Sequence, residues 1–150
     1  MEVTYKYAIM PLIRRKRIPA EQFPSDQLHA LQTMIRSYTG KDADYFRAQL
    51  TMIDKVQQGD YKGMMDSLDE AQKMGVLKNE SVHFYFIWLN LTYLKECKEA
   101  SVINRGLKWL NEIKSEPVSR PWMNMQASLY EAKGNVKKAA KIRAEAKQLK

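Results

Sequence analysis

The chain has 150 residues, of which 45% are hydrophobic and 28% charged, and its formal net charge is +8. These values are typical of one globular domain with a sizeable core. No run of about 18 apolar residues is present, which argues against a membrane-spanning helix, and we expect no secretory signal. Cys97 is the single cysteine, so no intramolecular disulfide can form; we expect a reducing compartment and a cytoplasmic location.

The positive charge is concentrated at the two ends of the chain. Residues 1–24 hold five Lys or Arg and two Asp or Glu, which gives +3, and residues 119–150 hold eight and two, which gives +6. The long middle, 25–118, holds twelve and thirteen, which gives −1. This asymmetry indicates an acidic partner, a nucleic acid or an anionic surface at one or both ends. The alternative is a solubilising cap at the end of a helical stack.

Residues 1–24 differ from the rest of the chain. Apolar residues alternate with others from Val3 to Ile9, which is a strand-like period of two. Prolines at positions 11, 19 and 24 exclude one continuous helix, and Arg14-Arg15-Lys16-Arg17 lies between them. We predict an extended basic arm with at most one short strand. This arm lies along the helices, pairs with another chain or stays mobile.

Seven helices are predicted in the remainder from the 3.6-residue period of apolar positions and from capping residues. Ser25 is a plausible first N-cap, Gly40 and Gly75 suit helix ends, and Asp42 or Asp44 opens the second helix. The predicted ranges are roughly 25–38, 42–58, 60–75, 81–94, 102–110, 122–133 and 135–149.

The fourth predicted helix is unusual because residues 84–94 are apolar on nearly every side. Periodicity alone does not distinguish a buried helix from a buried strand in such a run, and aromatic residues favour strands. Its length and its helical neighbours favour a helix, which we expect at the centre of the domain.

A turn signal recurs between these helices. Gln58-Gly59-Asp60-Tyr61 and Lys133-Gly134-Asn135-Val136 each separate two amphipathic stretches, and a third junction lies halfway between them, near Cys97. A period of roughly 37 residues is typical of stacked helical hairpins. We therefore predict an all-α fold with a single helical-repeat domain over 25–150, whose hairpins cover about 42–75, 81–115 and 119–150.

The last hairpin resembles a tetratricopeptide repeat (TPR). With Gly134 in the turn, Trp122 or Met123 takes the large early position of that family, Ala127 the small position and Tyr130 the aromatic one; Ala139 and Ala146 fall on the small positions of the second helix. The middle hairpin matches in its first helix only, at Phe86, Leu89, Asn90 and Tyr93, and the first hairpin at Gly59-Asp60-Tyr61 and Ala71. The resemblance covers roughly residues 45–150.

This resemblance implies a TPR-like α-α superhelix of stacked antiparallel hairpins, whose first helices line a concave groove for an extended peptide or a helix. The corresponding positions carry no Lys or Arg, which disfavours the carboxylate clamp of some family members. The groove is short and could be filled by the chain's own arm. The candidate partner-binding residues are Gln49, Ile53, Ile87, Leu91, Asn124 and Ser128.

No pattern in the sequence indicates catalysis, a bound metal or a cofactor. His29 and His83 are far apart and have no ligand-like spacing to each other or to Cys97. The charges around Cys97 nearly cancel, so we expect an inert thiol. Phosphate-binding loops and dinucleotide fingerprints are absent.

Two groups of basic residues are candidates for binding anions. They are interpreted either as contacts to phosphate backbones or acidic surfaces, or as ordinary solvent-facing charge. Aromatic residues do not alternate with the basic residues of the last helix, as single-strand binding would favour. The candidate basic patch comprises Arg14, Arg15, Lys16, Arg17, Lys137, Lys138 and Lys141.

Three functional hypotheses follow from the sequence. The first is a non-enzymatic interaction or scaffold module that recognises a protein segment, either a peptide or a helix. The second is a nucleic-acid-binding protein that uses its basic ends. The third is a structural subunit that docks onto a neighbour, including another copy of itself, through residues 1–24.

Overall fold

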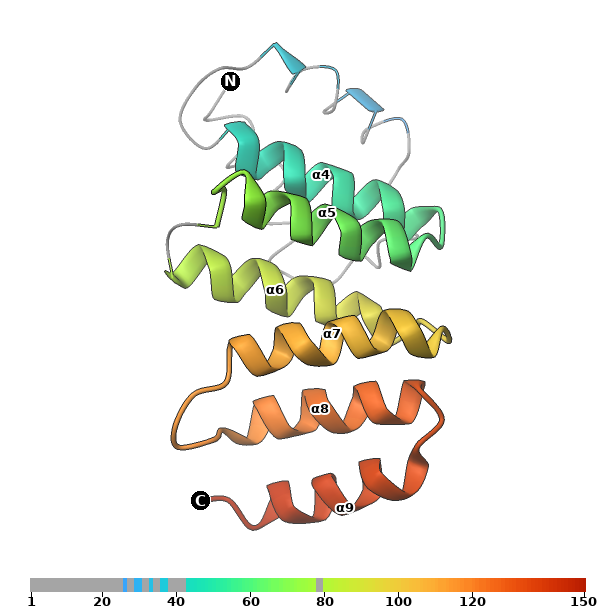
Figure 1. Ribbon diagram of the computed structural model, residues 1–150, viewed down its shortest axis with the longest axis vertical. Helices are drawn as coiled ribbons and strands as arrows, with labels where there is room; N and C mark the ends of the chain where they lie inside the picture. Colours follow the sequence, from blue (N-terminus) through green and yellow to red (C-terminus); the bar gives the residue numbers. More distant parts are fainter. Residues whose placement is uncertain (1–25, 27–28, 31–32, 34–35, 38–42, 78–79) are drawn as a thin grey trace. The chain divides into compact units, whose positions relative to one another are not determined.

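The structure is a computed structural model, and it describes residues 26, 29–30, 33, 36–37, 43–77 and 80–150. The chain divides into two compact units, Met1–Leu77 and Lys78–Lys150, which are described separately below. Six helices and no strand occur within 43–77 and 80–150 (Figure 1). The prediction of an all-α fold is therefore confirmed for this part of the chain.

In the first unit, α4 (Ala43–Gln57) packs antiparallel against α5 (Tyr61–Lys73). Apolar side chains recur every three or four positions on both helices, which places them on the facing sides. They form the core of this hairpin, which comprises Phe46, Leu50, Met52, Ile53, Val56, Met64, Met65 and Leu68.

The turn between α4 and α5 has a defined set of backbone hydrogen bonds. Gly59 has φ of +70°, a backbone conformation that residues other than glycine rarely adopt. The Asp60 N–H donates to the Lys55 carbonyl at 2.9 Å, which satisfies a free carbonyl at the end of α4. The Asp60 carboxylate then accepts from the Gly63 N–H at 2.8 Å and caps α5.

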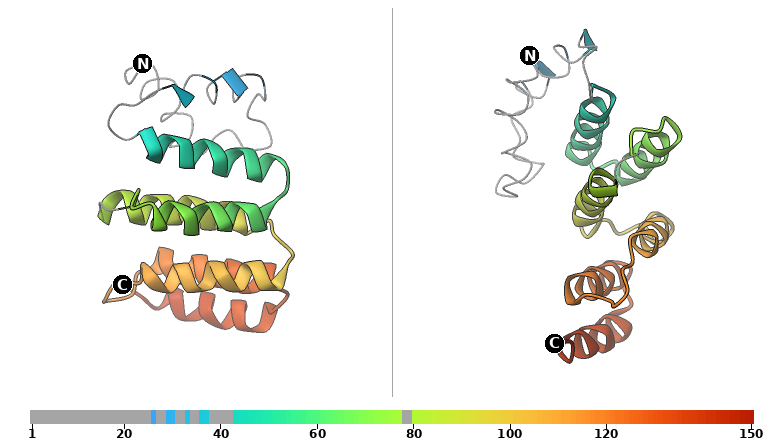
Figure 2. Two further views of the ribbon diagram at one scale, coloured as in Figure 1. Left: turned by 45° about the horizontal axis from the view of Figure 1, so that its top comes forward. Right: turned by 90° about the vertical axis from the view of Figure 1, so that its left-hand side faces the viewer.

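The second unit contains four helices that run in alternating directions, side by side (Figures 1 and 2). They are α6 (Glu80–Leu94), α7 (Ala100–Glu112), α8 (Arg120–Ala132) and α9 (Val136–Lys147). Each helix packs against the next along the chain, and α6 also contacts α8.

The turn between α8 and α9 reproduces the turn between α4 and α5. Gly134 has φ of +93°, the Asn135 N–H donates to the Tyr130 carbonyl at 2.8 Å, and the Asn135 side chain accepts from the Lys138 N–H at 3.2 Å. Every one of these positions lies 75 residues after its counterpart in the first turn. The recurrent sequence signal therefore corresponds to a recurrent backbone geometry.

The junction between α6 and α7 is built without glycine. The Cys97 N–H donates to the Leu94 carbonyl at 3.0 Å, and the Glu99 N–H donates to the Cys97 sulfur at 3.4 Å. Because the buried sulfur accepts this bond, Cys97 takes part in the start of α7, where the Glu99 side chain makes no cap.

The apolar run 84–94 is helical, so the helix interpretation of this segment is confirmed. Phe86, Ile87 and Leu91 are fully buried, but Phe84 is 47% exposed and its ring stacks on that of Trp88 with centroids 5.7 Å apart. The expectation of a helix buried on all sides is therefore too strong, because one side of α6 presents aromatic surface.

The start of α8 differs from the prediction. We placed the start of the sixth predicted helix near Trp122 and assigned Pro121 to the linker, but α8 begins at Arg120. Ser119 accepts from the Trp122 N–H as the N-cap, and Pro121 lies in the first turn, where its missing N–H costs no hydrogen bond.

Most of the chain before residue 43 lies outside the described residues. This includes the predicted arm 1–24 with Arg14, Arg15, Lys16 and Arg17, and much of the first predicted helix, 25–38. The described residues of that range from Asp26 to Arg36 are helical. The seven-helix count and the single-domain range 25–150 remain predictions.

Replacing Gly106 with alanine tests the close approach of α7 to α6. A Cβ at this position would lie 2.0 Å from Leu94 Cδ2, and Leu94 is fully buried. Overpacking costs about 1–3 kcal/mol, which exceeds the gain in helix propensity of about 1 kcal/mol. We expect Gly106→Ala to lower the free energy of unfolding in urea by about 1 kcal/mol, whereas Asn104→Ala, at an exposed position of α7, should not lower it. A stabilised Gly106→Ala variant would contradict this packing.

Candidate functional site

The six residues predicted to line a concave groove lie in different environments. Gln49 and Ile53 on α4, and Ile87 and Leu91 on α6, are almost completely buried. Gln49 uses its side-chain amide to donate to the Tyr45 hydroxyl at 2.8 Å. In this conformation these four side chains are not accessible to a partner.

The two predicted positions on α8 are accessible. Asn124 is exposed and Ser128 is half-buried one turn later, and the Ser128 hydroxyl donates to the Asn124 carbonyl at 3.0 Å. The structure thus brings the predicted residues together as pairs on single helices. Gln49 and Ile53 belong to the first unit, and the other four residues belong to the second.

A surface groove that the sequence analysis did not identify lies between α4 and α5. It has a volume of about 690 Å³ and lies entirely within the first unit. Its lining residues are Asp44, Arg47, Ala48, Thr51, Lys55, Asp60, Lys62, Gly63, Asp66, Ser67, Glu70, Ala71, Met74 and Val76. None of the six predicted groove residues is among them.

Small side chains line this α4–α5 groove between the charged ones. Ala48 and Thr51 come from α4, and Gly63, Ser67 and Ala71 follow one another at four-residue intervals on α5. The Thr51 and Ser67 hydroxyls donate to carbonyls of their own helices, at 2.9 and 3.0 Å. These hydroxyls therefore present little unsatisfied polarity to an incoming group.

The charged lining of the groove is largely paired. Arg47 lies 2.9 Å from Asp44, Lys55 lies 3.5 Å from Asp60, and Lys62 lies 2.8 Å from Asp66. Glu70 adds a fourth carboxylate. Because three cations face four anions, the groove is nearly neutral and has charges of both signs.

Three basic side chains of the α8–α9 hairpin have partners within it. Arg120 donates to the Ala146 carbonyl at 3.1 Å and to the Leu149 carbonyl, so it satisfies acceptors at the end of α9. Lys138 lies 4.1 Å from the centre of the Tyr130 ring and donates to the Tyr130 hydroxyl at 2.9 Å.

The third of these side chains is Arg143, which pairs with Glu131 of α8. This hydrogen bond and the charge of the guanidinium lower the pKa of the Glu131 carboxyl. The carboxylate and the guanidinium therefore largely neutralise each other at the edge of the hairpin.

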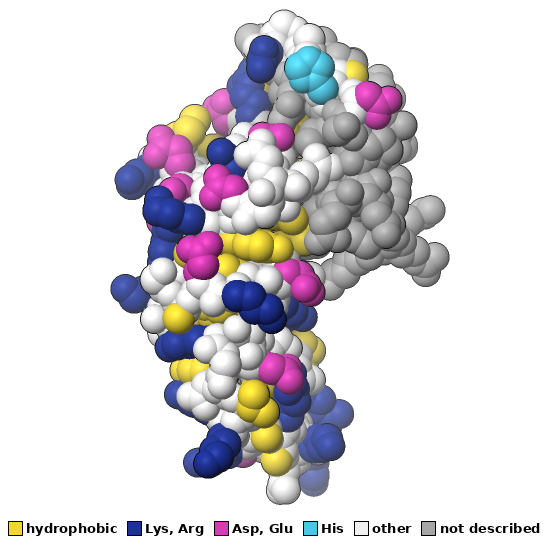
Figure 3. Space-filling view, turned by 90° about the vertical axis from the view of Figure 1, so that its right-hand side faces the viewer, with side chains coloured by type: hydrophobic (Ala, Val, Ile, Leu, Met, Phe, Trp, Pro, Cys, Tyr) yellow, Lys and Arg dark blue, Asp and Glu magenta, His cyan; other side chains and the backbone are white. Residues whose placement is uncertain are grey.

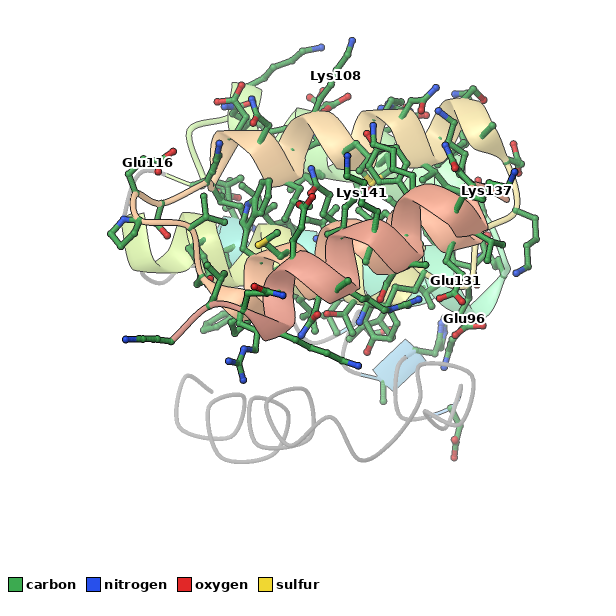
Figure 4. All side chains as sticks on the ribbon, turned by 90° about the horizontal axis from the view of Figure 1, so that it is seen from below. Glu96, Lys108, Glu116, Glu131, Lys137 and Lys141 are labelled. Atoms are coloured by element: carbon green, nitrogen blue, oxygen red, sulfur yellow. The ribbon has the colours of Figure 1, made fainter. Side chains whose placement is uncertain are left out.

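Lys137 and Lys141 differ from these residues. Both are exposed, and neither has an acidic partner within 4.0 Å among the residues that the structure describes. Figure 4 shows them on the same side of α9. Of the predicted basic patch, Lys137 and Lys141 are thus available to an external anion, Lys138 already contacts Tyr130, and the four residues of the arm lie outside the described part.

Cys97 and His29 are the cysteine and the histidine whose side chains the structure describes. Burial raises the pKa of the Cys97 thiol, which disfavours the reactive thiolate. His29 is exposed in the first unit, and the placement of the His83 side chain lies outside the description. Within the described residues, no group of three or more His, Cys, Asp or Glu side chains is arranged to hold a metal ion.

One buried polar atom of α6 has no partner among the described residues. Asn90 is fully buried, and its side-chain amide donates to the Phe86 carbonyl at 2.8 Å, whereas its Oδ1 atom accepts no hydrogen bond from the described part of the chain. A buried unsatisfied acceptor destabilises the folded chain by about 1–3 kcal/mol.

No helix in the described part of the chain is both long and apolar enough to cross a membrane. Comparison with protein families, with curated proteins and with solved structures finds no match for this chain.

The unsatisfied Asn90 acceptor leads to a stability prediction. Leucine has the same branched shape as asparagine and no polar atom, so Asn90→Leu removes the cost of burying Oδ1. We expect the free energy of unfolding, measured in urea, to rise by about 1 kcal/mol. Asn124→Leu is the control at an exposed position of α8 and should change stability little. A loss of stability in Asn90→Leu would show that the amide has a partner that it needs.

Proposed function

We propose that this protein is a non-enzymatic interaction module that binds a helical segment of another protein in the groove between α4 and α5. The observation that supports this proposal is the combination of a groove of about 690 Å³, small residues along it and paired charges beside them. Helical-hairpin stacks generally act by presenting surfaces, and the TPR-like character of the sequence supports the same class of function.

The dimensions and chemistry of the groove suit a helix. Ala48, Thr51 and Ser67 are small lining residues that are exposed or half-buried, so they form the part of the groove that a docked helix can approach. Small side chains let a second backbone approach closely. Met74, which is 59% exposed and lines the groove, supplies a flexible apolar contact.

The charge of the groove suggests the composition of the partner. Because the lining contains both cations and anions, a partner of one sign would meet repulsion as well as attraction. The complementary segment is an amphipathic helix with small or flexible apolar residues in the centre and charges of both signs at its edges.

The four buried residues of the predicted groove are not part of the proposed binding site. Gln49, Ile53, Ile87 and Leu91 are buried, so a partner that used them would require a conformational change. The α4–α5 groove requires no such change, because most of its lining residues are exposed or half-buried. We therefore still propose protein binding, but we assign it to the α4–α5 groove and not to the side of α4 that carries Gln49 and Ile53.

Site-specific photo-crosslinking tests the proposal. A benzoylphenylalanine residue at Thr51, which is exposed and lines the groove, should form adducts with a protein from the native extract. The same group at Gln72, an exposed residue of α5 that does not line the groove, is the control. We expect adducts at position 51 that survive nuclease treatment and are absent at position 72.

A second variant separates binding in the groove from proximity to it. Ser67→Trp fills the groove and should abolish the adduct at position 51, while circular dichroism and the melting temperature report on folding. The milder Ser67→Gln is used if the tryptophan destabilises the hairpin. Equal crosslinking at positions 51 and 72, or an adduct that persists in Ser67→Trp, would reject the groove as the binding site.

A further inference from the structure

The net positive charge of the protein resides almost entirely in the second unit. Lys78–Lys150 contains fourteen Lys or Arg, seven Glu and no Asp, which gives +7, whereas Met1–Leu77 contains eleven basic and ten acidic residues, which gives +1. Lys and Arg side chains surround the part of the unit formed by α8 and α9 in Figure 3, where acidic side chains are sparse.

Within this unit, α9 presents its lysines away from the core. Ala139, Ile142 and Ala146 are the buried residues of α9 and define the side that packs on α8. At 100° per residue, Lys137 and Lys141 lie nearly opposite to that side. We call the exposed surface formed by Lys137, Ala140, Lys141, Ala144 and Lys147 the outer face of α9.

The cations of the outer face are not neutralised by the described part of the chain. Lys137, Lys141 and Lys147 have no acidic partner within 4.0 Å among the described residues, and Glu145 is the single carboxylate of α9. Lys137 and Lys141 are about 6 Å apart along the helix axis, and Lys147 lies about 15 Å from Lys137. The result is a row of exposed ammonium groups along one helix.

The composition of the outer face distinguishes between anionic partners. An interfacial membrane helix needs exposed large apolar residues opposite its lysines, whereas the side of α9 opposite Lys137 and Lys141 is buried against α8. A protein interface depends on a few large anchors, mainly aromatic residues and arginine, which are absent from the outer face. A phosphate backbone needs only cations, because affinity comes from the release of condensed counterions.

We infer that the outer face of α9 binds the phosphate backbone of a double-stranded nucleic acid without sequence preference. Lysines are point charges that contact phosphates and do not make the bidentate contacts that identify bases. The face has no aromatic side chain on which an unpaired base could stack, which favours a duplex over a single strand. This surface is independent of the α4–α5 groove.

Fluorescence anisotropy with a labelled DNA duplex of about 20 base pairs, titrated with the full chain at about 50 to 200 mM NaCl, tests this inference. Binding should weaken steeply with salt. In the double variant Lys137→Gln/Lys141→Gln, we expect affinity to fall about tenfold at the lowest salt and the log–log salt slope to become smaller by about 2.

Two further variants test whether the effect depends on this face and not on net charge alone. Arg36→Gln/Lys73→Gln removes the same charge from exposed positions in the first unit and should leave affinity within about twofold. Glu145→Gln removes the carboxylate of α9 and should strengthen binding. Circular dichroism confirms that each variant folds, since exposed Lys→Gln changes preserve helix propensity.

Several outcomes would overturn the inference. One is no binding of the duplex by the unaltered chain at the lowest salt, and another is equal weakening by the two double variants, which would indicate net charge alone. Competition by polyglutamate as effective as that by duplex DNA, at equal charge, would assign the face to an acidic protein. Tighter binding of a single strand of the same sequence would reject the duplex. The same titration with an RNA duplex shows whether the face prefers a DNA or an RNA backbone. Binding of either duplex in preference to the single strand and to polyglutamate supports the inference.

Discussion

Close contact between neighbouring helices is the constraint on which the outer face of α9 depends. In the second unit, α7 approaches α6 at Gly106, where a Cβ would overlap the buried Leu94 side chain. In the last hairpin, Ala127 and Ala139 are fully buried, with Met123 and Tyr130 packed around them. Because small residues occupy the contact between α8 and α9, α9 buries a narrow side and leaves a broad one at the surface. The outer face of α9 is this broad side.

The sequence predicts the parts of the fold that are determined locally. Gly59 and Gly134 permit the left-handed backbone that ends a helix, and Asp60 and Asn135 supply the side chains that cap the next one. Both interactions involve residues within a few positions of each other, so the signal is visible in the sequence. The start of α8 was placed too late, because Ser119 can act as N-cap two residues before a proline in the first turn.

Properties that depend on contacts between helices are not available from the sequence alone. Spacing places Gln49 and Ile53 on one side of α4, but it does not say whether that side is covered, and the structure shows that both are buried. In the same way, the sequence does not show which of Lys137, Lys138 and Lys141 has a contact within the chain. Only Lys138 contacts Tyr130, because the turn at Gly134 brings that ring from α8 to α9.

The α4–α5 groove and the outer face of α9 differ in their electrostatics, and this difference separates their proposed partners. Paired charges of opposite sign, such as Lys62 and Asp66, produce a field that falls off over a short distance. Partner choice in the groove therefore depends on shape and on the local order of charges. The lysines of the outer face are not paired with charges of opposite sign in the described part of the chain, so their electric field acts over a longer range. The contribution of this field to binding falls steeply with salt. We therefore expect ionic strength to separate the two proposed activities, because moderate salt weakens contacts to phosphate before it affects a packed helix.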